Sequence, residues 1–83
     1  MQGLMHERVR DLIADVLRVA PARITYQSDL SQDLRADSLD LIELSMQLEE
    51  AFGIEIQAED MQYFNTVRQV IDYLGWKVNG EVS

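Results

Sequence analysis

The sequence of 83 residues predicts an all-α fold, a small four-helix bundle with three main helices, a short third helix and a long loop between the first two helices. Apolar residues recur three and four residues apart in three separate segments, which is the spacing of one helix face. No alternating segment is long enough to build a sheet. A chain this short has room for one core, so residues 1–83 are predicted to form a single domain.

The first helix is predicted over residues 3–18. Its apolar residues share one helix face: Met5, Val9, Leu12, Ile13, Val16 and Leu17. Pro21 requires this helix to end before it. Residues 20–37 then form a long ordered loop, and loops of this length in a compact domain usually have a functional reason. Four apolar side chains are expected to pin the loop to the core: Ile24, Tyr26, Leu30 and Leu34.

The second helix is expected from Ser38 to Phe52. Asp37 is placed to cap its free amides, and Gly53 is placed to end it in the left-handed conformation. At about 100° per residue, five apolar residues form the side that faces the core: Leu41, Leu44, Leu48, Ala51 and Phe52. The short alternation at residues 54–56 predicts a linker that places two isoleucines in the core.

The last third of the chain predicts a short helical turn and a longer helix. Glu59 and Asp60 open the turn over residues 58–64, because acidic residues favour a helix N-terminus. The pattern from Thr66 to Gln69 fits a capping box for the final helix. That helix shares one apolar face, made of Val67, Val70, Ile71 and Leu74. Gly75 is expected to stop it, which leaves residues 76–83 as a loose C-terminal tail.

The charge of the chain excludes several classes of protein. A net charge of −8 argues against nucleic-acid binding, which requires clustered Lys and Arg, and predicts basic partners. The excess is local, because residues 29–60 contain ten acidic residues and one basic residue, Arg35. With no Cys, the chain can form no disulfide, thiolate zinc cluster or cysteine nucleophile.

Targeting signals are not found in the sequence. The N-terminus lacks a basic start followed by an apolar run, so no secretory signal is expected. No apolar segment reaches the roughly 20 residues that cross a bilayer. The sequence therefore predicts a soluble, cytoplasmic protein without a membrane span. A monomer is also expected.

The second helix also has an apolar seam opposite its core side. Leu39, Ile42 and Met46 cluster there, bordered by Glu43 and Glu50 on one flank and by Glu49 on the other. Two interpretations stay open at this point. The seam is either a docking face or a surface buried beneath the long loop or the short third helix. The acidic border favours docking, since carboxylates would attract a basic partner before apolar contact supplies affinity.

The motif before this seam resembles a known family. The segment Ala36-Asp37-Ser38-Leu39-Asp40, with the phrases that continue through residue 74, closely resembles the acyl carrier proteins of type II fatty acid synthesis. Asp-Ser-Leu alone is a common tripeptide, but here it begins an acidic helix and the later phrases lie at matching distances. The likeness is weak before about Leu30. It implies that residues 1–83 form a single acyl carrier domain.

The resemblance implies a specific role for Ser38. In that family this Ser carries a covalent 4′-phosphopantetheine arm, whose thiol holds acyl groups as thioesters, and the protein is a carrier and not an enzyme. The expected helix N-terminus suits the phosphate of the arm. The alternative is that Ser38 only caps the helix, as most Ser at such positions do. The resemblance favours attachment.

The resemblance also implies partners and a place for the cargo. The partners are a phosphopantetheinyl transferase (holo-carrier synthase) and acyl-processing enzymes with basic docking patches. By matching position, the partner-facing residues are Asp37, Leu39, Asp40, Ile42, Glu43, Met46, Glu49 and Glu50. An acyl pocket would be lined by Leu44, Leu48, Phe52, Ile56, Met61 and Phe64.

Three positions depart from the family pattern. Arg35 stands where the family commonly has Gly, Gln57 where a Pro often follows, and Leu41 where Thr is frequent. These departures leave the carrier role intact. They keep open a specialised carrier, including a polyketide or aminoacyl carrier, in place of a carrier for housekeeping lipid synthesis.

Other functions fit the sequence less well. A calcium loop would use an EF-hand-like register of Asp29, Ser31, Asp33, Arg35, Asp37 and Asp40. Leu34 occupies the position of that loop that requires Gly, so no metal site is expected. His6 has no nucleophile at a useful spacing and is expected to be a solvated helical residue, so no catalytic residues are predicted. An acidic adaptor that uses the same docking face without an arm remains an alternative.

Overall fold

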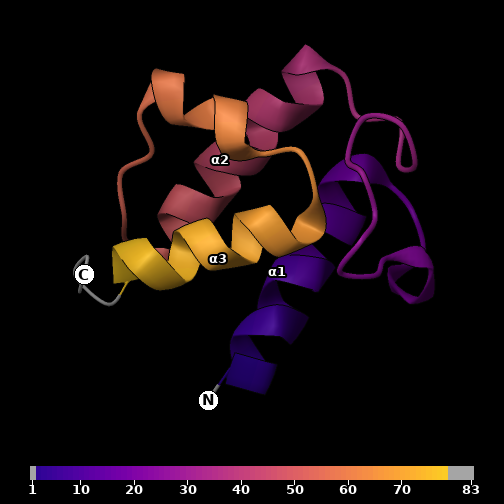
Figure 1. Cartoon of the computed structure of the whole chain (residues 1–83), viewed down its shortest axis with the longest axis horizontal. Coiled ribbons are helices and arrows are strands. Elements are labelled where there is room, and N and C mark those ends of the chain that lie inside the picture. Colours follow the sequence, from indigo (N-terminus) through magenta and orange to yellow (C-terminus); the bar gives the residue numbers. More distant parts are fainter. Residues whose placement is uncertain (1, 79–83) are drawn as a thin grey trace.

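The computed structural model describes residues 2–78, with side chains from residue 5 onward, and it confirms the all-α prediction. Within this range there are three long helices and two short 3-10 helices and no strand (Figure 1). They are α1 (Gln2–Leu17), η1 (Pro21–Arg23), α2 (Ser38–Phe52), η2 (Ala58–Tyr63) and α3 (Val67–Val78). None of these helices is both long and apolar enough to cross a membrane.

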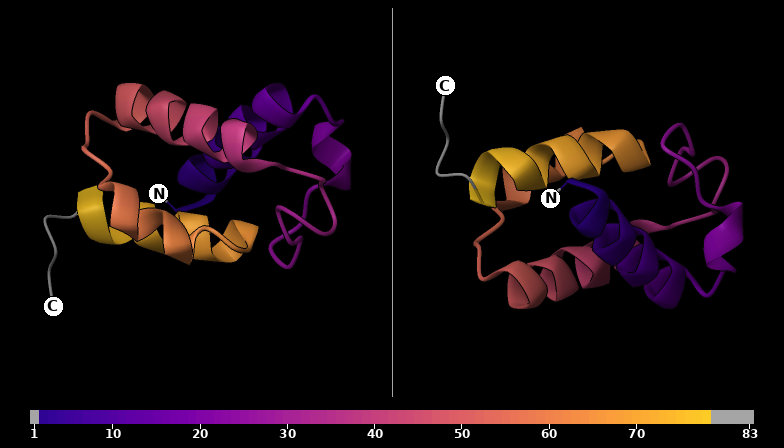
Figure 2. Two further views of the ribbon diagram at one scale, coloured as in Figure 1. Left: turned by 90° about the horizontal axis from the view of Figure 1, so that it is seen from above. Right: turned by 90° about the horizontal axis from the view of Figure 1, so that it is seen from below.

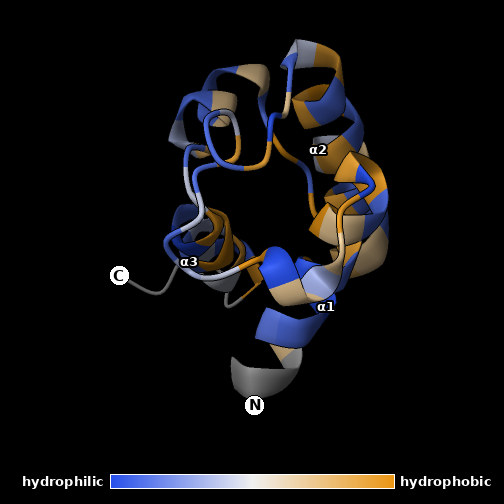
Figure 3. Ribbon diagram, turned by 90° about the vertical axis from the view of Figure 1, so that its right-hand side faces the viewer, coloured by the Kyte–Doolittle hydropathy of each residue, from blue (hydrophilic) through white to orange (hydrophobic). Residues whose placement is uncertain are grey.

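The helices enclose one core. Helices α2 and α3 lie on opposite sides of the molecule, η2 lies beside α3, and the loop after α1 closes one end (Figure 2). Each long helix alternates hydrophobic and hydrophilic residues, as an amphipathic helix does (Figure 3). The largest fully buried side chains come from all three helices and the loop: Val9, Ile13, Leu30, Leu44, Leu48, Val70 and Leu74.

The ends of α1 and α2 follow from local sequence. Helix α1 ends one residue earlier than predicted, because Arg18 adopts a left-handed φ of 61° and the Val19 amide donates to the Ala14 carbonyl at 3.1 Å. Helix α2 has the predicted bounds. Asp37 caps its start, and Gly53, at φ 66°, ends it in the left-handed conformation that glycine tolerates best.

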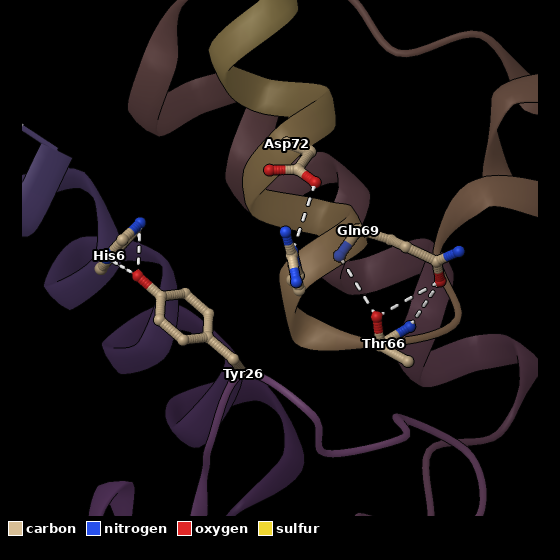
Figure 4. Close-up of polar contacts among 6 residues, drawn as sticks. His6, Tyr26, Thr66, Gln69 and Asp72 are labelled. Atoms are coloured by element: carbon tan, nitrogen blue, oxygen red, sulfur yellow. Dashed lines mark hydrogen bonds and ion pairs between the residues drawn. The ribbon is translucent and has the colours of Figure 1, made fainter.

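The long loop is pinned by three of the four predicted residues. Ile24, Leu30 and Leu34 are buried, whereas Tyr26 is exposed, so the prediction for Tyr26 was wrong. Its hydroxyl instead contacts the ring of His6 on α1, and this contact lies at the surface (Figure 4). The Leu30 amide donates to the Asn65 carbonyl at 2.8 Å, which ties the loop to the residues just before α3.

The segment between α2 and α3 follows the prediction closely. Ile54 and Ile56 are half-buried and pack against the core, as the linker interpretation requires. The predicted helical turn is present as the 3-10 helix η2 and ends at Tyr63, one residue early. The linker and η2 therefore connect α2 to the far side of the core without adding a strand.

Helix α3 begins as predicted but continues past the predicted stop. The Gln69 amide donates to the Thr66 hydroxyl at 3.2 Å, and the Thr66 amide donates to the Gln69 side chain at 2.9 Å, so the capping box is confirmed. Gly75 lies inside the helix and does not stop it, and residues 76–78 are helical where a loose tail was predicted. Interior glycine costs about 1 kcal/mol, and Gly75 lacks the positive φ with which Gly53 ends α2. Residues 79–83 lie outside the described residues.

Candidate functional site

Ser38 is the first residue of α2, and its neighbour caps the helix. The Asp40 amide donates to the Asp37 carboxylate at 2.8 Å, and the Asp37 amide donates to the Asp40 carboxylate at 3.2 Å. The capping alternative for Ser38 is therefore wrong, because Asp37 already occupies the cap position. Ser38 is exposed, and its hydroxyl has no hydrogen-bond partner among the described residues. A small nucleophilic oxygen is thus presented at a helix N-terminus.

A tightly bonded loop holds this helix start in place. The Asp29 carboxylate accepts hydrogen bonds from the Ser31 and Gln32 amides at 3.0 and 2.8 Å, and the Asp33 carboxylate accepts from the Asp29 amide at 2.7 Å. The Ala36 amide then donates to the Leu30 carbonyl at 2.8 Å. These bonds fix the chain two residues before Ser38.

The carboxylates of this loop bond the backbone. The Asp29 side chain accepts from the amide two residues on, as in an Asx turn, and the Asp33 side chain accepts from the amide four residues before it. In the part of the chain that the structure describes, no group of three His, Cys, Asp or Glu side chains lies close enough to hold a metal.

Arg35 has an unusual backbone conformation. Its φ is 65°, in the left-handed region that favours glycine and costs other residues about 1–2 kcal/mol. The loop geometry explains why the resembled family commonly has Gly at this position. Arg35 is exposed three residues before Ser38, and no carboxylate in the described range lies within ion-pair distance of it.

The second apolar seam of α2 is open to solvent. Leu39, Ile42 and Met46 are 74%, 52% and 59% exposed. They line a shallow hollow of about 790 Å³ together with the side chains of Glu43, Gln47, Glu49 and Glu50. The alternative in which the loop or the short third helix buries this seam is therefore wrong.

The acidic residues around the seam differ in their other contacts. Glu49 is half-buried, and its carboxylate accepts a hydrogen bond from the Ile56 amide at 2.8 Å, which fixes the linker after α2. Glu43 and Glu50 are exposed. Their charges are thus the most available to a partner, while Glu49 also stabilises the fold.

The six residues expected around an acyl chain lie in one hydrophobic cluster. Leu44, Leu48 and Phe64 are buried. Phe52, Ile56 and Met61 are half-buried and pack against them. The structure therefore gathers them between α2, the linker and η2, on the inner side of the helix that begins at Ser38.

Two contacts of α1 were missed at the level of sequence. The Arg8 guanidinium donates to the Ala51 carbonyl at 3.0 Å and lies 4.5 Å from the centre of the Phe52 ring, so it stabilises the C-terminus of α2. His6 is not merely solvated, because its ring contacts Tyr26 edge-on, with centroids 4.6 Å apart (Figure 4). Both pairs are far apart in sequence, so no local pattern indicates them.

The site matches known proteins in sequence and in structure. A family model described as a phosphopantetheine attachment site matches residues 7–74. An acyl carrier protein of Thermosynechococcus vestitus is 43% identical over 77 residues, which are 93% of this chain and 95% of that protein. An acyl carrier protein of Amoebophilus asiaticus is also 43% identical, over 84% of this chain and 88% of its own length.

A solved structure shows the same arrangement of helices. It is a Mycobacterium tuberculosis protein described as an acyl carrier protein, with a TM-score of 0.79 and 35% identity over 86% of this chain and 95% of that one. Sequence, fold and the exposed Ser of the Asp-Ser-Leu motif agree. The chain therefore belongs to the acyl carrier proteins, the non-catalytic proteins that carry acyl groups on a covalently attached 4′-phosphopantetheine.

Proposed function

We propose that Ser38 is the attachment residue for 4′-phosphopantetheine and that the chain shuttles acyl intermediates of fatty acid or related biosynthesis between enzymes. The observation that carries this proposal is the exposed hydroxyl of Ser38. Asp37, and not Ser38, caps α2, so the Ser38 hydroxyl is not used for capping. The free amides and the dipole of α2 favour a phosphate at this end. The arm would supply the thiol that this Cys-free chain lacks.

Partner enzymes are proposed to dock on the outer face of α2. Acyl carrier proteins as a family interact with a phosphopantetheinyl transferase and with acyl-processing enzymes. Leu39, Ile42 and Met46 offer apolar contact, and Glu43 and Glu50 would attract basic patches on these partners. Asp37, Asp40 and Glu49 add charge while they also hold the fold.

The acyl chain is proposed to shelter in the core beside α2. Leu44, Leu48 and Phe64 would move apart to admit it, and the half-buried Phe52, Ile56 and Met61 form the side through which the cluster could open. Apolar burial would protect the chain from water. We further propose that the protein acts as a cytoplasmic monomer, which cell fractionation and sedimentation of the purified protein would test.

The decisive experiment measures attachment directly. The apo protein is incubated with a phosphopantetheinyl transferase, coenzyme A and magnesium, and its intact mass is recorded. We expect a gain of one phosphopantetheine in the wild-type chain and in Ser45→Ala, the matched control at the other serine of α2, but none in Ser38→Ala. A wild-type chain that stays unmodified while a known carrier is loaded would support the unmodified adaptor instead.

A loaded carrier still has to be assigned to a pathway. The experiment compares the transfer of malonyl and other acyl groups to the loaded carrier with the transfer of aminoacyl groups. The preferred donor distinguishes a fatty acid or polyketide carrier from an aminoacyl carrier. The acidic α2 and the Asp-Ser-Leu-Asp phrase favour acyl donors.

A further inference from the structure

A second surface feature lies across the molecule from the α2 face. It is a cleft of about 470 Å³ lined by residues of η2 and α3. These two helices lie across the molecule from α2 (Figure 2). Its lining consists of Asp60, Tyr63, Gln69, Asp72, Tyr73 and Trp76. We call it the aromatic cleft. The attachment residue, the apolar seam of α2 and the acyl cluster make no use of it.

The aromatic cleft exposes large rings that the core does not need. Trp76 and Tyr63 are 47% and 52% exposed, whereas Tyr73 is buried and forms the base. The Tyr73 and Trp76 rings are inclined at 49° with centroids 6.1 Å apart, so they present neighbouring π surfaces. Tyr and Trp exposed together at a concave site are typical of binding surfaces.

Two carboxylates stand beside these rings. Asp60 accepts a hydrogen bond from the Tyr73 hydroxyl at 2.6 Å, which leaves further acceptor positions on its two oxygens. Asp72 lies 3.9 Å from the Arg68 guanidinium, but both side chains are largely exposed, and such pairs are weak. Both carboxylates can therefore accept hydrogen bonds from a ligand.

A cation of the chain lies near two of these rings. The Lys77 ammonium lies 5.9 Å from the centre of the Tyr73 ring and 5.8 Å from that of the Trp76 ring. These distances are within the range of cation–π attraction. Lys77 is thus an intramolecular cation near two of the rings that line the cleft.

We propose that the aromatic cleft is a second docking site, which binds an arginine side chain of a partner protein. A guanidinium can stack flat on Trp76 or Tyr63 while its N–H groups donate to Asp60 and Asp72. A lysine ammonium offers no plane for stacking and is more strongly hydrated. The proposal does not depend on Ser38 or on the arm, so it can fail while the carrier function stands.

The test uses the unmodified full-length protein and a short capped peptide, Gly-Arg-Gly, with citrulline replacing arginine in the matched control. Citrulline keeps the shape of the side chain and removes its charge. Binding is followed by amide NMR spectra and by the indole signal of Trp76, the single Trp of the chain. We expect the arginine peptide, and not its citrulline analogue, to shift signals of residues 60–63 and 69–76.

Three substitutions sharpen this test without touching the core. Tyr63→Ala and Asp72→Asn each remove an exposed contact and should weaken binding about two- to fivefold. Lys77→Gln removes the competing cation and should tighten binding by a similar factor. Asp15→Asn, at an exposed position of α1 outside both the cleft and the α2 face, is the matched control and should leave the affinity of the cleft unchanged.

Several outcomes would overturn the proposal. Equal binding of the citrulline peptide would exclude charge recognition, and equal binding of a Gly-Lys-Gly peptide would exclude recognition of the guanidinium. Shifts confined to α2 would place the peptide on the acidic face alone. If the NMR signals of the cleft residues shift when the protein alone is diluted, a second copy of the chain occupies the cleft.

Discussion

Helices α2 and α3 have similar lengths but use their apolar residues differently. The 15 residues of α2 bury only Leu44 and Leu48. The 12 residues of α3 bury five side chains: Val67, Val70, Ile71, Tyr73 and Leu74. Leu39, Ile42 and Met46 of α2 point to solvent instead. Helix α3 thus contributes more buried side chains to the core, while α2 leaves much of its apolar surface exposed.

The same two helices differ in charge. Helix α2 contains four acidic residues and no basic one, although a cation near its C-terminus would stabilise it. Arg8 of α1 supplies that cation by donating to the Ala51 carbonyl. Helix α3 has its own basic residue, Lys77, in the last turn. The C-terminal cation of α2 thus comes from another helix, and α2 itself carries charges of one sign only.

The largest expected effect contrasts one leucine from each helix. Leu74→Ala removes a fully buried side chain from α3 and should lower the free energy of unfolding by about 2–5 kcal/mol. Leu39→Ala removes an exposed one from α2 and should change it by less than about 0.5 kcal/mol. Urea unfolding followed by circular dichroism measures both. Equal losses from the two substitutions would contradict the division of roles between the helices.

The second prediction concerns charge on α2. Glu43→Lys should slow loading by a phosphopantetheinyl transferase about tenfold at low salt, because it reverses a charge on the proposed docking face. Added salt should reduce the difference. Asp15→Lys makes the same change in net charge at an exposed position of α1 and is the matched control. Equal rates for the two variants would remove the argument for local steering.

The third prediction uses Tyr73, the residue of α3 that contacts η2. Burial, reinforced by the hydrogen bond to Asp60, raises the pKa of Tyr73 well above its ordinary value of 10.0. The folded state then holds this proton more tightly than the unfolded state. The contribution of this proton to the free energy of unfolding is fully present below about pH 10. It is lost as the pH rises further, by about 1 kcal/mol between pH 10 and 11.

Urea unfolding across this pH range checks the prediction. Tyr73→Phe cannot ionise and should lose the part of the pH dependence that Tyr73 causes. Tyr63→Phe, at the exposed wall of the same cleft, should retain it. A wild-type protein whose alkaline pH dependence matches that of Tyr73→Phe would contradict this assignment.

Local sequence predicted the parts of the fold that depend on local chemistry. Asp37, Gly53 and the Thr66–Gln69 box act within a few residues, so the ends of α2 and the start of α3 were predicted correctly. The exposed seam was found by helical spacing, but spacing alone could not distinguish docking from burial. That choice depends on where the loop and η2 lie, which is set by long-range packing.

Two errors came from the preferences of single residue types. Glycine is a common helix terminator, but Gly75 lacks the left-handed backbone that ends a helix, and α3 continues to Val78. Tyr26 was assigned to the core by its hydrophobic ring, but His6 of α1 offers its hydroxyl a partner at the surface. In both cases the preference of the residue type did not decide its place in the fold. The aromatic cleft was missed because Tyr63 and Trp76 come from different elements.

The smallest expected effect compares the two ends of the loop between α1 and α2, since each end contains an Arg with left-handed backbone. Arg35 and Arg18 have φ values of 65° and 61°. Glycine at these positions relieves about 1–2 kcal/mol of backbone strain but costs about 0.5–1 kcal/mol in chain entropy. Arg35→Gly and Arg18→Gly should therefore each raise the free energy of unfolding, measured in urea, by about 0.5 kcal/mol.

The two arginines differ in their distance from the attachment residue. Only Arg35 is close to Ser38 in sequence, within the acidic segment that basic partners are proposed to approach. Arg35→Gly should therefore also speed loading by a phosphopantetheinyl transferase at low salt, because it removes a cation near Ser38. If Arg18→Gly speeds loading equally, net charge and not the position of the cation controls the encounter with the transferase.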